Sequence, residues 1–149
     1  MTTAELKFRV PTPADAAEAC RWLTPAQRPV DLLDRANNYY AIVDAGDRLV
    51  GVCCFGPRAQ VGGGDYKAQA IDVAAHWPEH LAPEASAIVL AVALFSKALF
   101  NVAPLRATTS VAQTLIRAWE AAGFLPIQRF SGSDGGDYLQ LAMPPSNLG

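Results

Sequence analysis

Residues 68–101 constrain the fold more than any other stretch of the chain. The first part, AQAIDVAAHW, has the pattern of a half-buried strand, and the last part, AIVLAVALFSKALFN, predicts an apolar helix too short to span a bilayer. A polar segment with two prolines connects them. A strand that leads into a buried helix needs neighbouring strands, and it brings the anion-attracting N-terminus of the helix beside the strand's end. We therefore expect the functional site at this junction.

The composition is that of one globular unit. The chain has 149 residues, of which 51% are hydrophobic and 17% charged, enough for one core. We expect a single domain over residues 3–143 and a frayed tail over residues 144–149. The net charge is -2, and the lysines and arginines are scattered singly, so neither a nucleic-acid partner nor a membrane partner is expected.

The N-terminal sequence and the cysteines favour a cytoplasmic protein with reduced thiols. MTTAELKFRV lacks the basic segment and long apolar run of a signal peptide, and the three cysteines are an odd number. Cys53 and Cys54 are adjacent in a strand, so their side chains point to opposite faces and form no metal pair. His76 and His80 are separated by Pro78 and have no third ligand nearby. We expect no metal.

The N-terminal quarter predicts a strand followed by helices. Leu6, Phe8 and Val10 alternate with basic residues, which indicates a strand over residues 6–10. Thr12 as a cap, Pro13 at the first helical position and Asp15 three residues after the cap predict a short helix that ends near Trp22. A second start signal at residues 24–27 predicts a broken helical segment up to residue 36.

The rest of the chain alternates strands and helices. Residues 39–44 and 48–55 predict a hairpin whose turn contains Gly46, a residue able to take positive φ. Residues 61–65 contain three glycines, and without a following Lys-Ser/Thr they favour a connecting loop over a phosphate loop. A strand over residues 104–109, a helix over residues 111–122 stopped by Gly123, and a hairpin of residues 125–130 and 137–143 complete the pattern.

This order of elements resembles the GNAT N-acetyltransferase superfamily. YYAIVDAGDRLVGVCCFG is similar to the family's second and third strands, and Trp119-Glu120-Ala121-Ala122-Gly123-Phe124 resembles its aromatic-glutamate-x-x-Gly-Phe signature. The resemblance spans residues 6–143. It implies an α+β fold, with a mixed, mostly antiparallel sheet of about seven strands and helices on both faces.

The resemblance implies acetyl transfer from acetyl-CoA to an amine, carried by a small molecule or a peptide. In the family, the fourth and fifth strands splay apart, and the fourth pairs with the pantetheine arm of CoA as with another strand. The pyrophosphate lies on amides at the start of the next helix. Carried onto this sequence, the cofactor-binding residues are Ile71, Val73, Ala74, Ala75, Ala82, Glu84, Ala85 and Ser86.

The phosphate segment departs from the family pattern. Where the family has a glycine-rich loop, this chain has HLAPEAS at residues 80–86. Pro83 contributes no amide donor, and Glu84 brings negative charge towards a dianionic ligand. The resemblance is therefore to a divergent member with a degraded pyrophosphate loop. The same two residues also fit an ordinary helix start with nothing bound.

The helix that carries the family signature departs as well. The family often has a Tyr that protonates the departing thiolate and an Asn seven residues before it, and these positions hold Trp119 and Ala112. An indole N–H is not an acid, so Trp119 cannot take that role. A core aromatic residue is the favoured interpretation of Trp119.

Two residues are candidates for the general base. Asp72 lies on the opposite strand face from Ile71 and Val73, which is either the cleft or solvent. His76, at the end of the same strand, has a suitable unperturbed pKa.

The sequence as a whole leaves two hypotheses for the function. The first is an acetyl-CoA-dependent N-acetyltransferase. The second is a non-catalytic module of the same fold that binds a small molecule or a second copy of itself, as in a homodimer.

Overall fold

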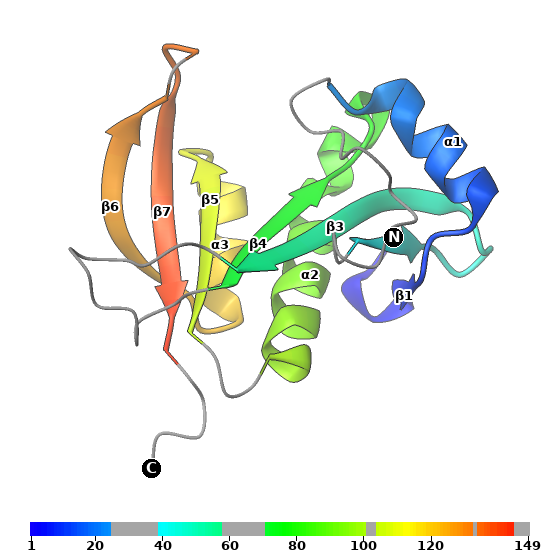
Figure 1. Cartoon of the computed structure of the whole chain (residues 1–149). Helices are drawn as coiled ribbons and strands as arrows, with labels where there is room; N and C mark the ends of the chain where they lie inside the picture. Colours follow the sequence, from blue (N-terminus) through cyan, green and yellow to red (C-terminus); the bar gives the residue numbers. More distant parts are fainter. Residues whose placement is uncertain (25–38, 58–70, 101–103, 133, 145–149) are drawn as a thin grey trace.

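The computed structural model describes residues 1–24, 39–57, 71–100, 104–132 and 134–144 (Figure 1). Three sequence predictions concern segments outside the described residues. They are the broken helical segment that ends at residue 36, the glycine-rich loop of residues 61–65, and the frayed tail, of which only Pro144 is described.

The described strands form one seven-stranded sheet in the order β1-β2-β3-β4-β5-β7-β6. Neighbouring strands run antiparallel except for β4 and β5, which are parallel. This confirms the predicted mixed, mostly antiparallel sheet. The strands are β1 (Lys7–Arg9), β2 (Tyr39–Val43), β3 (Leu49–Pro57), β4 (Ile71–His76), β5 (Leu105–Ser110), β6 (Leu125–Ser131) and β7 (Asp137–Met143).

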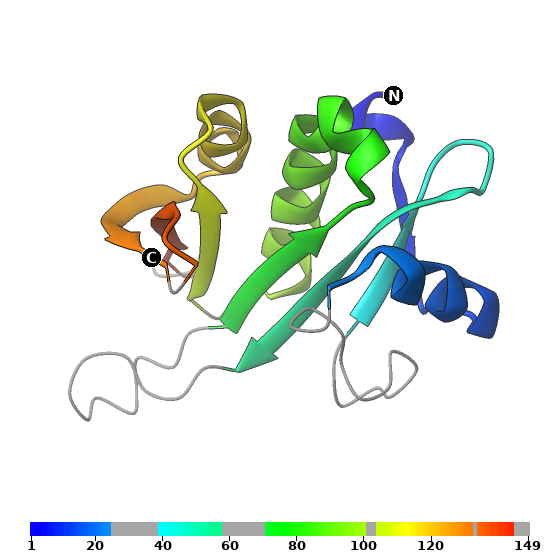
Figure 2. The same ribbon diagram turned by 90° about the horizontal axis from the view of Figure 1, so that it is seen from above.

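Helices cover both faces of the sheet, as predicted (Figure 2). On one face, Ala19 of α1 and Leu23, which directly follows α1, pack against Val52 of β3. The opposite face carries α2 and α3, which enclose the main core with buried residues such as Val73 of β4 and Trp119 of α3. The helices are α1 (Pro13–Trp22), α2 (Ala85–Leu99) and α3 (Gln113–Ala121), with the short 3-10 helices η1 (Thr3–Glu5) and η4 (Glu79–Glu84).

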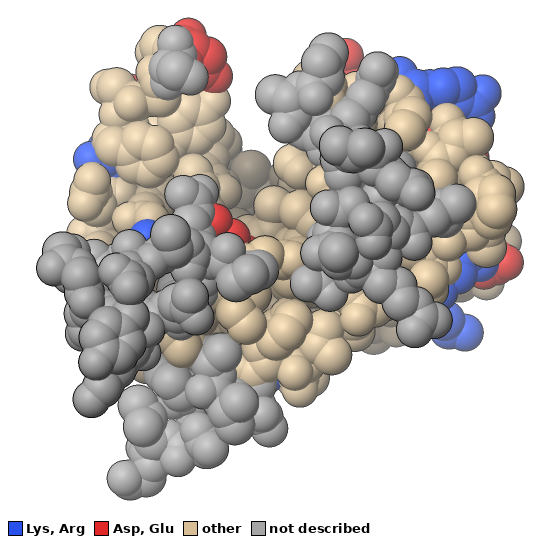
Figure 3. All heavy atoms as spheres, viewed as in Figure 1, with Lys and Arg blue, Asp and Glu red and all other residues tan. Residues whose placement is uncertain are grey.

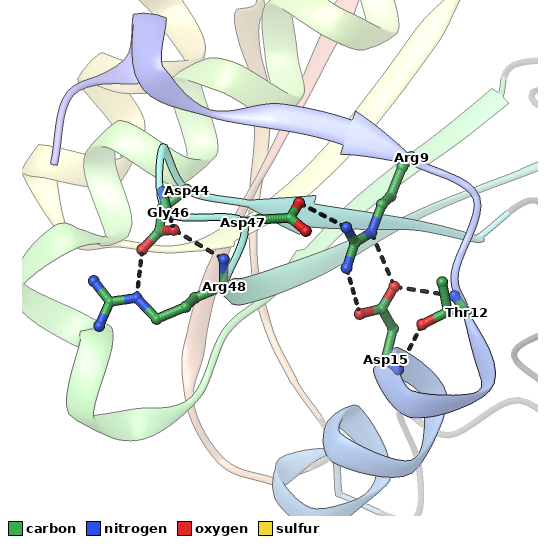
Figure 4. A network of polar contacts seen from close by, with 7 residues as sticks. All are labelled: Arg9, Thr12, Asp15, Asp44, Gly46, Asp47 and Arg48. Carbon is green, nitrogen blue, oxygen red and sulfur yellow. Dashed lines mark hydrogen bonds and ion pairs between the residues drawn. The ribbon is translucent and has the colours of Figure 1, made fainter.

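The predicted cap of α1 is present and is part of a polar network (Figure 4). The Thr12 side chain accepts from the Asp15 backbone N–H, and the Asp15 carboxylate accepts from the Thr12 N–H. Arg9 of β1 donates to both carboxylate oxygens of Asp15, at 2.8 and 3.1 Å, and to Asp47 in the β2–β3 turn at 2.7 Å. This network ties the first strand, the first helix and the first hairpin together.

The turn of the β2–β3 hairpin differs from the prediction in one residue. Positive φ occurs at Asp47, with φ 61°, and not at Gly46. Asp is one of the few non-glycine residues that tolerate this region. The Asp44 side chain also accepts from the backbone N–H groups of Gly46 and Arg48, which fixes the turn in this form (Figure 4).

The apolar helix α2 begins directly after η4. Together they span Glu79–Leu99, 21 residues with hydropathy 1.5, which by length and composition alone is long and apolar enough to cross a membrane. The prediction that the helix is too short for this considered only the apolar run and missed the helical turns of residues 79–84. Ile88, Val89 and Val92 are buried in the core, so in this fold the helix packs against the sheet.

Candidate functional site at the divergence of β4 and β5

The strands β4 and β5 are paired only over their first halves. The register joins Ile71 with Leu105, Asp72 with Arg106 and Val73 with Ala107, and it ends there. Beyond Val73 the two strands diverge, with β4 continuing beside β3 (Figure 1). This gap in the middle of the sheet is the feature on which the predicted acyl-CoA site depends.

The divergence leaves one strand residue of β4 with its backbone directed into the gap. Ile71 donates its N–H to the Pro104 carbonyl at 2.9 Å, so the backbone groups of Ile71 face β5. Because backbone groups alternate between the two neighbours of a strand, those of Val73 and Ala75 also face β5. Val73 lies within the paired part, whereas Ala75 lies beyond it. The edge open to a ligand is therefore centred on Ala75.

A cavity of about 430 Å³ occupies the gap. Its walls come from both faces of the sheet, so it passes from the α2–α3 face towards the α1 face. Figure 3 shows the molecule hollowed between its β5–β7 side and its α1 side. We call this space the inner cavity; it is lined by Ala75, His76, Trp77, Val89, Thr108, Thr109, Ser110, Leu115, Trp119 and Tyr138.

A second cavity of about 390 Å³ lies beside the first, between the starts of α2 and α3. The two share Trp77 and Leu115 as walls. We call this second space the outer cavity; its remaining walls are Ala82, Pro83, Ala85, Ser86, Ala112 and Thr114. Three of the four residues predicted to hold phosphate thus line the outer cavity: Ala82, Ala85 and Ser86. The two residues that depart from the family pattern at the next helix line different cavities, with Ala112 at the outer one and Trp119 at the inner one.

The start of α2 offers fewer free amides than a helix preceded by a loop. The Ala85 N–H already donates to the Ala82 carbonyl, because η4 continues into α2 without a break. Pro83 has no N–H. Glu84 is not a wall of either cavity, and its carboxylate lies 4.0 Å from the amino group of Met1. The predicted negative charge is therefore partly balanced, and neither Pro83 nor Ala85 has a free amide N–H.

The two predicted bases lie on the α1 face of the sheet. His76 is a wall of the inner cavity, and burial lowers its pKa below the ordinary value of 6.5, which keeps the imidazole neutral. Asp72 lies four residues before His76, within the paired part of β4 and on the same face, and is not a wall of the cavity. Its carboxylate contributes to raising the pKa of Cys54, after the larger effect of burial.

The adjacent cysteines have different surroundings, as predicted. Cys53 is fully buried in the main core, and burial raises the pKa of its thiol. Cys54 lies on the opposite face, where it pairs across the strands with Tyr39 and Ala74. Burial raises the thiol pKa there too, so neither cysteine has the lowered pKa of a nucleophile.

Trp119 is both a core residue and a cavity wall. Trp119 is 3% exposed, and its ring packs edge-on against that of Phe124 with 4.9 Å between the ring centroids. Both observations agree with the core interpretation. It also lines the inner cavity, at the position where the family often carries its Tyr. The indole thus adds an apolar wall where an acid would otherwise be placed.

Sequence reasoning missed the far wall of the inner cavity. Thr108, Thr109 and Ser110 form three consecutive hydroxyl residues at the diverging end of β5, and Tyr138 of β7 pairs with Ser110. Tyr138 donates its hydroxyl hydrogen to Asp134 in the β6–β7 turn. The run of hydroxyl residues at the end of a short strand was the signal in the sequence, but only the divergence of the sheet makes them a wall.

No family model matches the chain, and no curated protein matches it in sequence. Solved structures do match it. A chimera of the spermidine N-acetyltransferase SpeG from Vibrio cholerae and hSSAT has TM-score 0.66 and 13% identity, covering 95% of this chain and 97% of the other. A putative phosphinothricin N-acetyltransferase has TM-score 0.63 and 19% identity, covering 95% of this chain and 99% of the other.

The aminoglycoside N(6')acetyltransferase from Legionella pneumophila has TM-score 0.63 and 10% identity, covering 93% of this chain and 91% of the other. All of these structures carry the GNAT fold, and the likeness extends over nearly the whole chain. The chain therefore has the fold of the GNAT N-acetyltransferases.

Proposed function

We propose that the chain is an N-acetyltransferase that binds acetyl-CoA between β4 and β5 and transfers its acetyl group to an amine. The observation that carries this proposal is the inner cavity, which passes through the sheet and borders the open backbone of Ala75. A site that connects two faces of a sheet lets two substrates meet from opposite sides. The GNAT fold and the N-acetyltransferases that share it support the same activity.

In the proposed complex, the pantetheine arm extends β4 on its open side. Ala75 supplies the backbone groups, with Ala74 and the paired Ile71 and Val73 holding the strand in place. The pyrophosphate end occupies the outer cavity, beside Ala82, Ala85 and Ser86, with Glu84 next to them in the chain. Since few amides are free there, we expect binding to depend more on the arm than on the phosphates.

The acceptor amine approaches from the α1 face. His76 or Asp72 removes a proton from the ammonium group, directly or through water, and the free amine attacks the thioester carbonyl. A C–N bond forms, the C–S bond breaks, and the sulfur leaves as CoA thiolate, which takes a proton from solvent. A neutral His76 is in the correct state to accept the amine's proton. The amine belongs to a small molecule or a peptide.

Calorimetric titration with acetyl-CoA tests this proposal, followed by a screen of amines with detection of the free thiol. The screen should include spermidine and an aminoglycoside, after which two of the structural neighbours are named. We expect acetyl-CoA to bind and to raise the melting temperature, because a ligand of the native state stabilises it. Absence of heat and of a melting shift at millimolar acetyl-CoA would refute the activity.

The occupied amide of Ala85 and the missing amide of Pro83 favour a second candidate, a non-catalytic module of the same fold that binds a small molecule or a second copy. This candidate predicts no thiol release with any amine. A chain that binds CoA without releasing thiol would belong to this second class.

Self-association is a further part of the proposal. β6 is an edge strand whose residues are all exposed, including Leu125 at 61% and Ile127 at 58%. Exposed edges with apolar side chains favour pairing with another strand, and we propose a second copy as the partner. One structural neighbour, a Vibrio cholerae spermidine N-acetyltransferase, is described as dodecameric. Sedimentation of the wild type and of Ile127→Asp tests this; a monomeric wild type would refute it.

A further inference from the structure

Thr109 is a buried residue whose hydroxyl has no protein partner among the described residues. The residue is 6% exposed, yet no described residue donates to its hydroxyl or accepts from it. The other buried polar side chains, Asp15 and Ser96, are hydrogen-bonded within the protein. Thr109 differs from them because it lines the inner cavity.

The position of Thr109 on β5 directs its side chain to the helix side of the cavity. Side chains alternate along a strand, so Thr109 shares the face of Ala107, which packs in the core beneath α2 and α3. Its neighbours Thr108 and Ser110 are exposed on the opposite face. Among the described residues, Arg106 Nη2 is the fully enclosed side-chain polar atom that lacks a partner. The Thr109 hydroxyl oxygen is not enclosed in this way: it opens into the inner cavity, where a bound polar atom can reach it.

The layout of the two cavities indicates which part of the ligand meets Thr109. If phosphate lies at the start of α2 in the outer cavity, the extended arm reaches the inner cavity with its sulfur end. Trp119, at the family's Tyr position, is a wall of the same cavity and offers no acid. A hydroxyl on the facing strand is then a donor available to the sulfur on the helix side, beside the indole N–H of Trp119.

We propose that the Thr109 hydroxyl donates a hydrogen bond to the sulfur of CoA and stabilises it as a thiolate. This inference rests on the proposed function. No proton is transferred by Thr109: the electron pair of the broken C–S bond stays on sulfur, the hydroxyl shares its hydrogen, and solvent later supplies the proton. Charge-assisted hydrogen bonds of this kind are the strong ones, so the contact favours departure of the thiolate.

The test compares the binding of CoA and of desulfo-CoA, which lacks the sulfur, to the wild type, Thr109→Val and Thr109→Ser. Valine keeps the shape of threonine and removes the hydroxyl, whereas serine keeps the hydroxyl. At pH 9, where more of the CoA thiol is ionised than at pH 7, we expect Thr109→Val to weaken CoA binding about tenfold or more. Desulfo-CoA should bind all three proteins within about twofold, and Thr109→Ser should bind CoA like the wild type.

The pH profile separates this contact from a packing role. At pH 7 the thiol is mostly neutral and accepts weakly, so the difference between the wild type and Thr109→Val should shrink. Equal loss of CoA and desulfo-CoA binding in Thr109→Val, or no loss of either, would overturn the inference.

A wild-type measurement keeps the test valid if Thr109→Val does not fold. The wild type should prefer CoA over desulfo-CoA, and the preference should grow from pH 7 to pH 9; a preference that does not change with pH would overturn the inference. A wild type that binds neither ligand would instead refute the proposed function, and the inference with it.

Discussion

The carbonyl oxygen of His76 lies 2.7 Å from the point that a β-carbon on Gly51 would occupy. Gly51 is on β3, next to Val52, which pairs with His76 at the diverging end of β4. The missing side chain lets β4 stay close to β3 while it leaves β5. This contact therefore supports the open side of the candidate site from behind.

Gly51→Ala should destabilise the protein and disturb the end of β4. A backbone carbonyl cannot move aside as a flexible side chain can, so we expect a loss of about 1–3 kcal/mol in the free energy of unfolding. Gly56→Ala, on the same strand, is the control because no atom of the described residues lies within 4 Å of its β-carbon position. Chemical denaturation of both variants measures the difference. Equal stabilities would show that the contact imposes no constraint.

Asp15→Asn should weaken the protein at neutral pH and flatten its acid transition. Burial would raise the pKa of Asp15, but hydrogen bonds from Arg9 and Thr12 outweigh it and hold the pKa below 3.8. A lowered folded-state pKa gives stability that is present above pH 4 and lost as the pH falls through the folded-state value. We expect Asp15→Asn to cost about 1–2 kcal/mol at pH 7 and progressively less towards pH 2.

Asp47→Asn is the matched control, because Asp47 binds the same arginine with its side chain 76% exposed. Asn also tolerates positive φ, so the turn is preserved. An exposed pair of this kind contributes about 0–1 kcal/mol. If denaturation at several pH values shows the same loss for both variants, the buried position of Asp15 has no special importance.

His76 should titrate with a pKa below its ordinary value of 6.5. Burial lowers its pKa, so protonation is less favourable in the folded state than in the unfolded one. The free energy of unfolding should therefore be highest above pH 6.5 and decrease as the pH falls through the folded-state pKa. Titration of the ring protons by NMR, with His76→Gln for assignment, checks this. A midpoint at or above 6.5 would contradict it.

Ser86→Tyr should block the outer cavity without unfolding the protein. Ser86 is exposed on α2 and lines that cavity, so a phenol ring there would occupy the proposed phosphate space. We expect acetyl-CoA affinity to fall by at least tenfold, measured by calorimetry. Ala98→Tyr is the control, at an exposed position near the other end of the same helix. Equal affinity in the two variants would place the ligand elsewhere.

The sequence predicted the elements whose signals are local. The hairpin of β6 and β7 matches to within one residue, because alternation and the glycine-containing turn define it, and the cap of Thr12 and Asp15 is present as predicted. The positive φ at Asp47 escaped prediction, since it depends on hydrogen bonds from the turn to Asp44.

The candidate site was predictable only in part. Ala75 follows from the family resemblance and His76 from its place at the end of the predicted strand, and both line the inner cavity. Where β4 stops pairing with β5 depends on contacts between distant segments, so the restriction of the open edge to Ala75 required the structure. The role of Thr109 as a wall has the same origin, since a threonine in a strand carries no sign of what faces it.

Amide hydrogen exchange of Ala75, with and without acetyl-CoA, tests the central claim most directly. In the free protein the Ala75 N–H faces the gap between β4 and β5 and should exchange rapidly, whereas the Val73 N–H, within the paired part, should be protected. Saturating acetyl-CoA should slow the exchange of Ala75 by at least tenfold and leave Val73 unchanged. Exchange at Ala75 that is unaffected by bound acetyl-CoA would contradict the account.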